Sequence, residues 1–200
     1  LGGGAREHAI AWALNKSPKV EALFAAPGNP GIARFGTCFS IDPCDSAAVL
    51  QIARETGVDC VFAGPEAPLV AGVADSLRKA GITVFGPGRN GAMLEGSKAF
   101  AKQFMKRHGI PTAPFDIVYD MEQAEAALRK RTPPYVVKAD GLAAGKGAFL
   151  PDTMEEALGI CRRLLVEGEL NEAGKTVVIE DFLPGTEITI LAVTDGRTVR

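Results

Sequence analysis

The sequence predicts an α/β fold in which a parallel-sheet domain precedes an α+β domain. Strand and helix patterns alternate over residues 1–86, which is typical of a parallel sheet with helices on both faces. The glycine-rich stretch "GPGRNGAMLEG" at 86–96 then marks a boundary. Beyond it the regular alternation ends. We therefore expect one domain at 1–94 and a second at 95–200.

Each element of the first domain follows from its local pattern. The expected elements are strands at 20–26, 37–41, 58–64 and 82–86, and helices at 46–57 and 69–81. Both helices end on glycine, at Gly57 and Gly81, because glycine readily takes the left-handed conformation of a helix C-terminus. The chain itself opens within a strand.

The second domain begins with a helix at 97–109 that places Phe100 and Phe104 on one face. The elements expected after it are strands at 115–119, 135–140, 147–150, 176–183 and 186–193, and helices at 121–131 and 152–168. Asp152 and Glu155 have the spacing of a capping box for the last helix.

Composition restricts the class of protein. The 200 residues are 46% hydrophobic and 23% charged, with a net charge of −2, so neither a nucleic acid nor a membrane is an expected partner. The four cysteines form no C-x-x-C pair, and Cys60 and Cys161 lie in apolar contexts. We expect buried, reduced thiols in a cytoplasmic protein. With two histidines, a His/Cys metal site is not expected.

The stretch "VVKADGLAAGKG" at 136–147 suggests a phosphate-binding loop but is not a P-loop. Gly141 and Gly145 enclose three residues rather than four, and Gly147 stands where a P-loop has Ser or Thr. The loop runs from strand into strand, so we expect a flap over a hairpin whose backbone N–H groups bind phosphates. Lys138 alternates with Val137 and should point into the cleft under the flap. A lysine on an exposed strand edge is the alternative interpretation.

Three loops of the first domain follow strands: "LGGGAREHA", "PGNPG" and "GPEAPL". Parallel strands gather such loops at one sheet edge, where ligands bind. A dinucleotide site is not expected, because Glu7 stands where the third glycine of G-x-G-x-x-G should be. Arg6 beside the glycines suits a small anion, although a purely structural turn is the alternative. The Glu66 carboxylate could accept hydrogen bonds from an amine or a sugar hydroxyl of a ligand. The alternative interpretation is a solvated loop carboxylate without a ligand.

The stretches "KADGLAAGKG", "GSKAFAK" and "VVIEDFLPGTE" resemble the ATP-grasp domain of the phosphoribosylamine–glycine ligase (glycinamide ribonucleotide synthetase) family. "GGGAREHA", "PGNPG" and "GPEAPLVAGVADSLRKAGITVFGP" resemble its N-terminal domain, and the match covers the whole chain in order. The resemblance implies a Rossmann-like substrate-binding domain at 1–94. It also implies an ATP-grasp domain, truncated at its C-terminus, at 95–200, with a lid subdomain at 115–183.

The resemblance implies an ATP-dependent ligase of purine biosynthesis. Such an enzyme joins glycine to 5-phosphoribosylamine through glycyl phosphate and releases 5′-phosphoribosylglycinamide, ADP and phosphate. The implied cofactors are ATP and Mg²⁺ (or Mn²⁺). The family's metal ligands are expected after residue 200, so a protein consisting of these residues alone should be inactive.

The resemblance also implies residue roles. Lys98 and Lys138 are the expected catalytic residues and contact the ATP phosphates. The flap residues expected around the nucleotide are Gly141, Leu142, Ala143, Ala144, Gly145, Lys146 and Gly147. Glu180 should accept a hydrogen bond from the adenine amino group. The adenine hinge is expected at Asp181, Phe182 and Leu183, although Phe182 also suits a place in the core, and Glu187 should hold the ribose hydroxyls.

The phosphoribosylamine site is expected at the loops of the first domain. Its residues, by resemblance, are Gly3, Gly4, Arg6, Gly28, Asn29, Gly31 and Glu66. Two other interpretations stay open. One is another ATP-grasp carboxylate–amine ligase or a biotin-carboxylase-like enzyme, which the "REHA" and "PGNPG" loops disfavour. The other is a non-catalytic nucleotide-binding module, which the presence of both lysines and the full flap disfavours.

Overall fold

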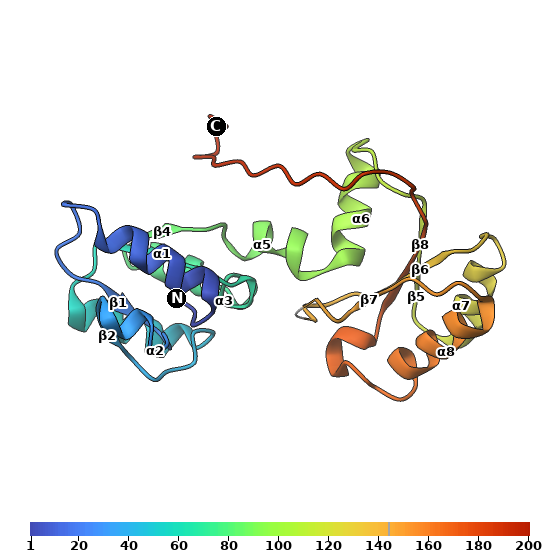
Figure 1. Ribbon diagram of the computed structural model, residues 1–200, viewed down its shortest axis with the longest axis horizontal. Coiled ribbons are helices and arrows are strands. Elements are labelled where there is room, and N and C mark those ends of the chain that lie inside the picture. The colour runs from blue at the N-terminus through green and yellow to red at the C-terminus, as the bar shows by residue number, and fades with distance from the viewer. Residues whose placement is uncertain (144) are drawn as a thin grey trace.

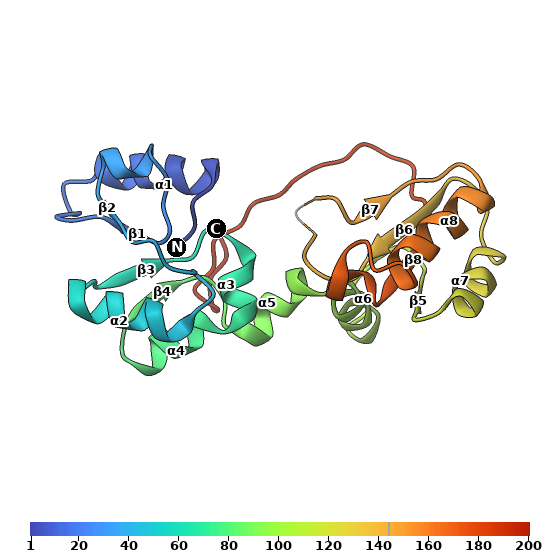
Figure 2. The same ribbon diagram turned by 90° about the horizontal axis from the view of Figure 1, so that it is seen from below.

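The computed structural model describes residues 1–143 and 145–200, and it forms two parts linked through helix α5 (Arg89–Gly96) (Figure 1). The first part contains short parallel strands and the second a four-stranded antiparallel sheet. After the last strand, the chain runs as an extended segment back toward the first part in both views (Figures 1 and 2). The expected order of a parallel-sheet part followed by an α+β part is confirmed.

Two parallel strand pairs form the sheet framework of the first part. The strands are β1 (Phe24–Ala25), β2 (Thr37–Cys38), β3 (Cys60–Phe62) and β4 (Thr83–Phe85). β1 pairs with β2, and β3 pairs with β4. Leu1 and Gly2 lie between the pairs: Gly2 N donates to Ala26 O at 2.7 Å, and Leu1 N donates to Phe62 O at 2.6 Å. The strands are shorter than the sequence predicts, but their parallel direction is confirmed.

Helices surround these strands. They are α1 (Ala5–Asn15), the 3₁₀ helix η1 (Ile32–Arg34), α2 (Ser46–Thr56), α3 (Glu66–Ala71) and α4 (Val73–Lys79). The expected helix at 46–57 is confirmed, and Gly57 ends it at φ +64°. The single helix expected at 69–81 is wrong, because Gly72 at φ +91° separates α3 from α4. Glu66 is therefore the first residue of a helix rather than a loop residue.

The stretch expected as a glycine-rich boundary contains helix α5. Its first N–H group, at Arg89, donates to Asp75 Oδ2 of α4 at 2.8 Å. Its buried Ala92 packs with Ala63, Leu69 and Ala74. These tertiary contacts compensate for the low helix propensity of glycine, so local composition alone could not reveal the helix.

The second part is built on a sheet in the order β5–β8–β6–β7, with every neighbouring pair antiparallel. Its strands are β5 (Phe115–Val118), β6 (Tyr135–Ala139), β7 (Ala148–Phe149) and β8 (Val177–Asp181). Its helices are α6 (Lys98–Arg107), α7 (Met121–Leu128), α8 (Met154–Leu165) and the 3₁₀ helix η2 (Asn171–Gly174).

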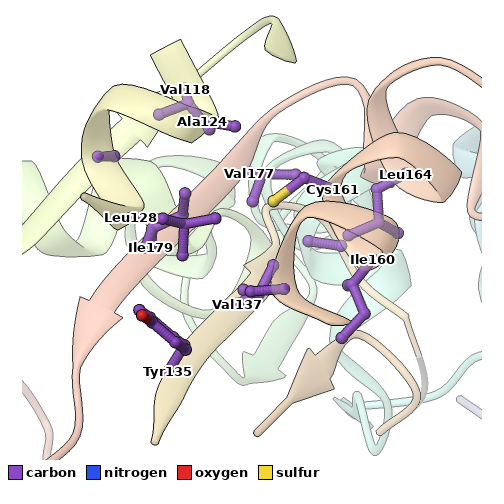
Figure 3. Packing of buried hydrophobic residues seen from close by; sticks show 13 residues of the cluster. Val118, Ala124, Leu128, Tyr135, Val137, Ile160, Cys161, Leu164, Val177 and Ile179 are labelled. Atoms are coloured by element: carbon purple, nitrogen blue, oxygen red, sulfur yellow. The ribbon is translucent and has the colours of Figure 1, made fainter. Parts of the chain in front are cut away.

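Helices α7 and α8 cover one face of this sheet and enclose the larger core (Figure 3). Val137 and Ile179 point from the central strands toward Leu128 and Leu164 of the helices, and all four are buried. The opposite side chains of β6 and β8, among them Lys138 and Glu180, therefore face away from this core. The sheet thus separates an apolar layer from a face on which Lys138 and Glu180 alternate with the buried Val136 and Val178.

Two expectations for the second part are wrong. The capping box of α8 uses Thr153 and Glu156, one residue later than expected, because Thr153 has the extended N-cap conformation. The alternating stretch at 186–193 forms no strand among the described residues, and its side chains are exposed. Alternation makes a strand possible, but a strand also requires a neighbour with which to pair.

All four cysteines have free thiols. The expectation of buried thiols is right for Cys161 and wrong for Cys60, which is exposed at the first position of β3. Cys161 lies in the core between α8 and the sheet. Burial raises the pKa of the Cys161 thiol to about 11.

At pH 8, iodoacetamide should alkylate Cys60 and spare Cys161 in the folded protein. Only a thiolate reacts, and the raised pKa keeps Cys161 protonated while the core blocks access to it. Peptide mass mapping measures the outcome, with urea-unfolded protein as the control in which both thiols react. Fast alkylation of Cys161 without unfolding would contradict its place in the core.

Candidate functional site

A cavity of about 640 Å³ lies between the first part and the polar side of the second-part sheet. Its wall combines Glu66 of α3, residues of α5 and α6, the β6–β7 hairpin and Glu180 of β8. A cavity of about 80 Å³ in the first part is much smaller and is lined mainly by hydrophobic side chains. The large cavity is therefore the candidate site, because it combines room for a ligand with convergent charged groups.

Lys138 lines this cavity, in agreement with its alternation with Val137, and Lys98, which only the resemblance implied, lines the cavity too. Lys98 is the first residue of α6, and its Nζ donates to Gly141 O at 3.1 Å. Burial lowers the pKa of Lys98; Asp140 partly opposes this effect, and the charge of Lys138 adds to it. An anion in the cavity would offset the repulsion between these two ammonium groups, so this region suits a phosphate.

Asp140 connects the end of β6 to the start of α6. Its Oδ1 accepts from Ala99 N at 2.6 Å and from Ser97 Oγ at 2.9 Å. Its backbone carbonyl accepts from Lys98 N at 3.1 Å. Ser97 in turn caps the helix by accepting from Phe100 N at 3.0 Å. This joint fixes Lys98 relative to Lys138, which lies two residues before Asp140, and sequence reasoning did not identify it.

Glu180 is buried in the cavity wall, where it meets two lysines. Its Oε1 lies 3.0 Å from Lys138 Nζ, and its Oε2 lies 2.8 Å from Lys102 Nζ. Lys102 was missed by the sequence analysis. A lysine three residues after Ala99, on the buried side of an amphipathic helix, is the signal that could have identified it.

The glycine-rich segment runs from β6 into the antiparallel β7, so the expected strand-to-strand flap is confirmed. Four of its residues, Leu142, Ala143, Gly145 and Gly147, line the cavity. Gly145 has φ +81°, a conformation that favours glycine. Gly141 provides a carbonyl to Lys98, Lys146 is exposed, and Ala144 lies outside the described residues.

The expected hinge and ribose residues lie farther from this wall. Asp181 ends β8 and pairs with Arg131 Nε at 3.0 Å. Phe182 and Leu183 are exposed, and Phe182 does not belong to the core. Glu187 is exposed in the extended segment. Of the predicted adenine and ribose residues, Glu180 is the one that the structure brings to the cavity lining.

The three loops of the first part meet, as expected. Asn29 Nδ2 donates to Gly3 O at 2.9 Å and to Gly4 O at 3.3 Å, so the "PGNPG" loop holds the first glycine loop. Arg6 pairs with Glu66 at 3.1 Å, and this contact raises the pKa of Arg6. Glu66 belongs both to this cluster and to the cavity wall, so the two sets of predicted residues share a boundary.

Two glycines of these loops are required by close packing. Gly28 has φ +72°, and an added Cβ would lie 2.4 Å from Cys38 Sγ. A Cβ at Gly31 would lie 2.3 Å from the His8 ring. Glu7, which replaces a dinucleotide-type glycine, accepts from Gly4 N at 2.6 Å. One amide of the glycine loop is therefore already bound to a carboxylate.

The described residues were searched for ligands of Mg²⁺ and for a helix that could cross a membrane. These residues contain no group of three or more His, Cys, Asp or Glu side chains placed to hold a metal ion. Glu180, the buried carboxylate of the cavity, has each oxygen beside a lysine. These residues therefore do not form a site for a divalent cation. Among the same residues, no helix has the length and apolar character to cross a bilayer.

Comparison with known proteins gives matches along the whole chain. The sequence models of phosphoribosylglycinamide synthetase match it, the N domain at residues 1–95 and the ATP-grasp (A) domain at 96–200. Phosphoribosylamine–glycine ligase of Agrobacterium fabrum is 48% identical over 99% of this chain and 47% of its own length. The chain thus spans about half the length of the curated relatives it matches.

Solved structures give the same picture. The crystal structure of phosphoribosylamine–glycine ligase from Thermotoga maritima is similar at a TM-score of 0.81 and 34% identity, over 99% of this chain and 46% of that one. The biotin carboxylase domain of Hydrogenobacter thermophilus 2-oxoglutarate carboxylase, solved with MgADP, has a TM-score of 0.70 at 21% identity. This match covers 88% of this chain and 42% of that one, and it shows a shared fold alone.

Replacing Asp140 with alanine should lower the free energy of unfolding by about 1–3 kcal/mol, because the Ala99 N–H and the Ser97 hydroxyl lose a charged acceptor. Urea denaturation measures the loss. Asp152→Ala, at an exposed position before α8, is the control and should change stability by less than about 0.5 kcal/mol. Equal effects of the two substitutions would show that the joint contributes nothing.

Proposed function

Because the chain belongs to the phosphoribosylglycinamide synthetase family, we propose that it serves the ATP-dependent ligation of glycine to 5-phosphoribosylamine. The single observation that carries the proposal is the cavity in which Lys98, Lys138, the glycine flap and Glu66 share one wall. In the reaction, the glycine carboxylate attacks the γ-phosphate of ATP to give glycyl phosphate and ADP. The amine of phosphoribosylamine then attacks the acyl carbon and releases phosphate.

Lys98 and Lys138 are proposed to hold the transferring phosphate. Two fixed ammonium groups stabilise the negative charge that develops on phosphoryl oxygens, and a partly buried cavity strengthens this effect. The backbone N–H groups of Leu142, Ala143, Gly145 and Gly147, which line the cavity, would donate to the remaining oxygens. Closure of the flap would keep water from the acyl phosphate.

The base and the sugar of ATP are proposed to lie along the end of β8. Glu180 offers a buried carboxylate oxygen to the adenine amino group, and the backbone from Asp181 to Leu183 would read the ring edge. Glu187 is proposed for the ribose hydroxyls. Its place in an exposed segment means that this segment would have to fold toward the nucleotide.

Phosphoribosylamine is proposed to bind at the loops of the first part. Asn29 links two of these loops through Gly3 and Gly4, and Arg6 presents an exposed guanidinium beside them. Gly28 and Gly31 complete the backbone of this surface. Because Glu66 also faces the cavity, an amine held there would approach an acyl phosphate formed beside Lys138.

Mg²⁺ bound to the triphosphate would neutralise phosphate charge. The described residues do not provide its ligands, so each proposed role belongs to the chain's own side chains and backbone. A cytoplasmic location is part of the proposal, and four free thiols support it.

We propose the domain limits 1–94 and 95–200, with a lid subdomain at 115–183. Separate apolar cores support them. One core contains Val49, Ala53, Val73 and Leu77 of the first part, and another lies under α7 and α8. Another ATP-grasp carboxylate–amine ligase or a biotin-carboxylase-like enzyme is the second candidate function, because the two lysines and the glycine flap in the cavity wall do not by themselves select the carboxylate or the amine.

A full-length family enzyme that contains this chain should form ADP and phosphate in equal amounts when ATP, glycine and phosphoribosylamine are all present. Lys138→Ala should lower kcat by roughly 10²–10³, because the lost charge acts on the transferring phosphate. Lys175→Ala, at an exposed lysine, is the control. Turnover with a different amine or carboxylate, and none with these substrates, would favour the second candidate function.

Arg6→Ala in the same enzyme should raise the KM for phosphoribosylamine about tenfold and leave the KM for ATP within about twofold. The substitution removes the guanidinium that is proposed to bind the phosphate of phosphoribosylamine and that pairs with Glu66. It leaves Lys98 and Lys138, the proposed ATP ligands, unchanged. Initial rates at varied concentrations of each substrate measure the split. Arg54→Ala, on an exposed face of α2, should change neither constant. An equal rise in both constants would contradict two separate subsites.

A further inference from the structure

Lys102 occupies an unusual place for a lysine. It lies within α6 with a side chain that is 9% exposed, at the wall of the cavity. Its Nζ donates to Thr112 Oγ1 at 2.7 Å and lies 2.8 Å from Glu180 Oε2. Lysine is seldom buried unless it is paired, so this position is defined by the carboxylate that it meets.

Glu180 therefore has one lysine on each oxygen. Lys102 lies at Oε2, deep in the wall, and Lys138 lies at Oε1 with a side chain that is 29% exposed toward the cavity. Both contacts are ion pairs without hydrogen-bond geometry, at 2.8 Å for Lys102 and 3.0 Å for Lys138. Lys102 is the more buried of the two lysines and also donates to Thr112, so Lys138 is the lysine that can move more easily.

The proposed function gives Lys138 a second task, because it must also reach a phosphate. A lysine that leaves a buried carboxylate leaves an uncompensated charge behind, which is costly in a poorly solvated site. Lys102 removes this obstacle. It neutralises Glu180 from the opposite side and stays in place through Thr112.

We propose that Lys102 is a positioning residue that holds Glu180 charged and fixed, so that Lys138 can exchange Glu180 for a nucleotide phosphate. The inference rests on the proposed function and assigns a role to a side chain that touches neither phosphate nor the reacting atoms. Lys102 acts only through Glu180. It lowers the free-energy cost of moving Lys138 away from Glu180 and toward a phosphate.

A double-mutant cycle in the full-length family enzyme tests the role. Lys102→Met keeps most of the unbranched apolar side chain and removes the charged Nζ. Glu180 then retains Lys138 as its counter-ion, so the KM and the Kd for ATP should rise about tenfold or more, while the KM for glycine stays within about twofold. In a Glu180→Gln background no charge needs compensation, and Lys102→Met should change the Kd for ATP by less than about threefold.

Lys106→Met is the matched control, because Lys106 lies one turn later on the same helix and is exposed. It should change no constant. If Lys102→Met does not fold, Thr112→Val is the variant to test, because it removes the hydroxyl that accepts from Lys102. It should raise the Kd for ATP about two- to fivefold in the wild-type background and leave the Kd unchanged in the Glu180→Gln background.

The outcomes are distinct. Tenfold weaker ATP binding that vanishes beside Glu180→Gln supports the inference. Equal losses in both backgrounds, or a general loss of stability with unchanged Kd, overturn it and leave the proposed function in place. A wild-type enzyme that binds no ATP overturns the proposed function and the inference with it.

Discussion

The joint between Asp140 and the N-terminus of α6 is the constraint on which the cavity depends. The carboxylate of Asp140 binds the first turn of α6, and the backbone of the same residue receives an N–H from Lys98. The sheet strand that carries Lys138 and the helix that carries Lys98 are thereby held at one distance. The ammonium groups of Lys98 and Lys138 repel each other. The hydrogen bonds of Asp140, which lies only two residues after Lys138, hold both lysines at the same cavity despite this repulsion.

Charge balance then determines how the cavity is arranged. Glu180 and Lys102 form a paired, buried layer below the two more open lysines. This layer lies on the side of the sheet opposite the apolar core of α7 and α8, so β6 and β8 serve two environments through the alternation of their side chains.

The loops of the first part join this arrangement through one residue. Glu66 begins α3, pairs with Arg6 and also faces the cavity of the second part. Gly72 ends α3 after six residues, and α4 begins at the next residue. The proposed ligation would need an activated acyl group and an amine at adjoining positions, and this shared wall would bring them close together.

The sequence by itself predicted a parallel-sheet part followed by an α+β part, the strand-to-strand nature of the glycine flap and the direction of Lys138, because periodicity and glycine placement are local properties. Lys98 was implied by the family resemblance alone. Tertiary structure alone decided the rest. Helix α5 exists because Asp75 caps it and Ala92 finds a core, and the stretch at 186–193 is not a strand because no described strand pairs with it. The partners of Lys102 and Asp140 became visible only in three dimensions, since Glu180 lies 78 residues from Lys102, and Ala99 and Ser97 lie 41 and 43 residues from Asp140 along the chain. A local sequence pattern indicates on which face of a helix or strand a side chain lies. It does not indicate which distant charged residue will pair with that side chain.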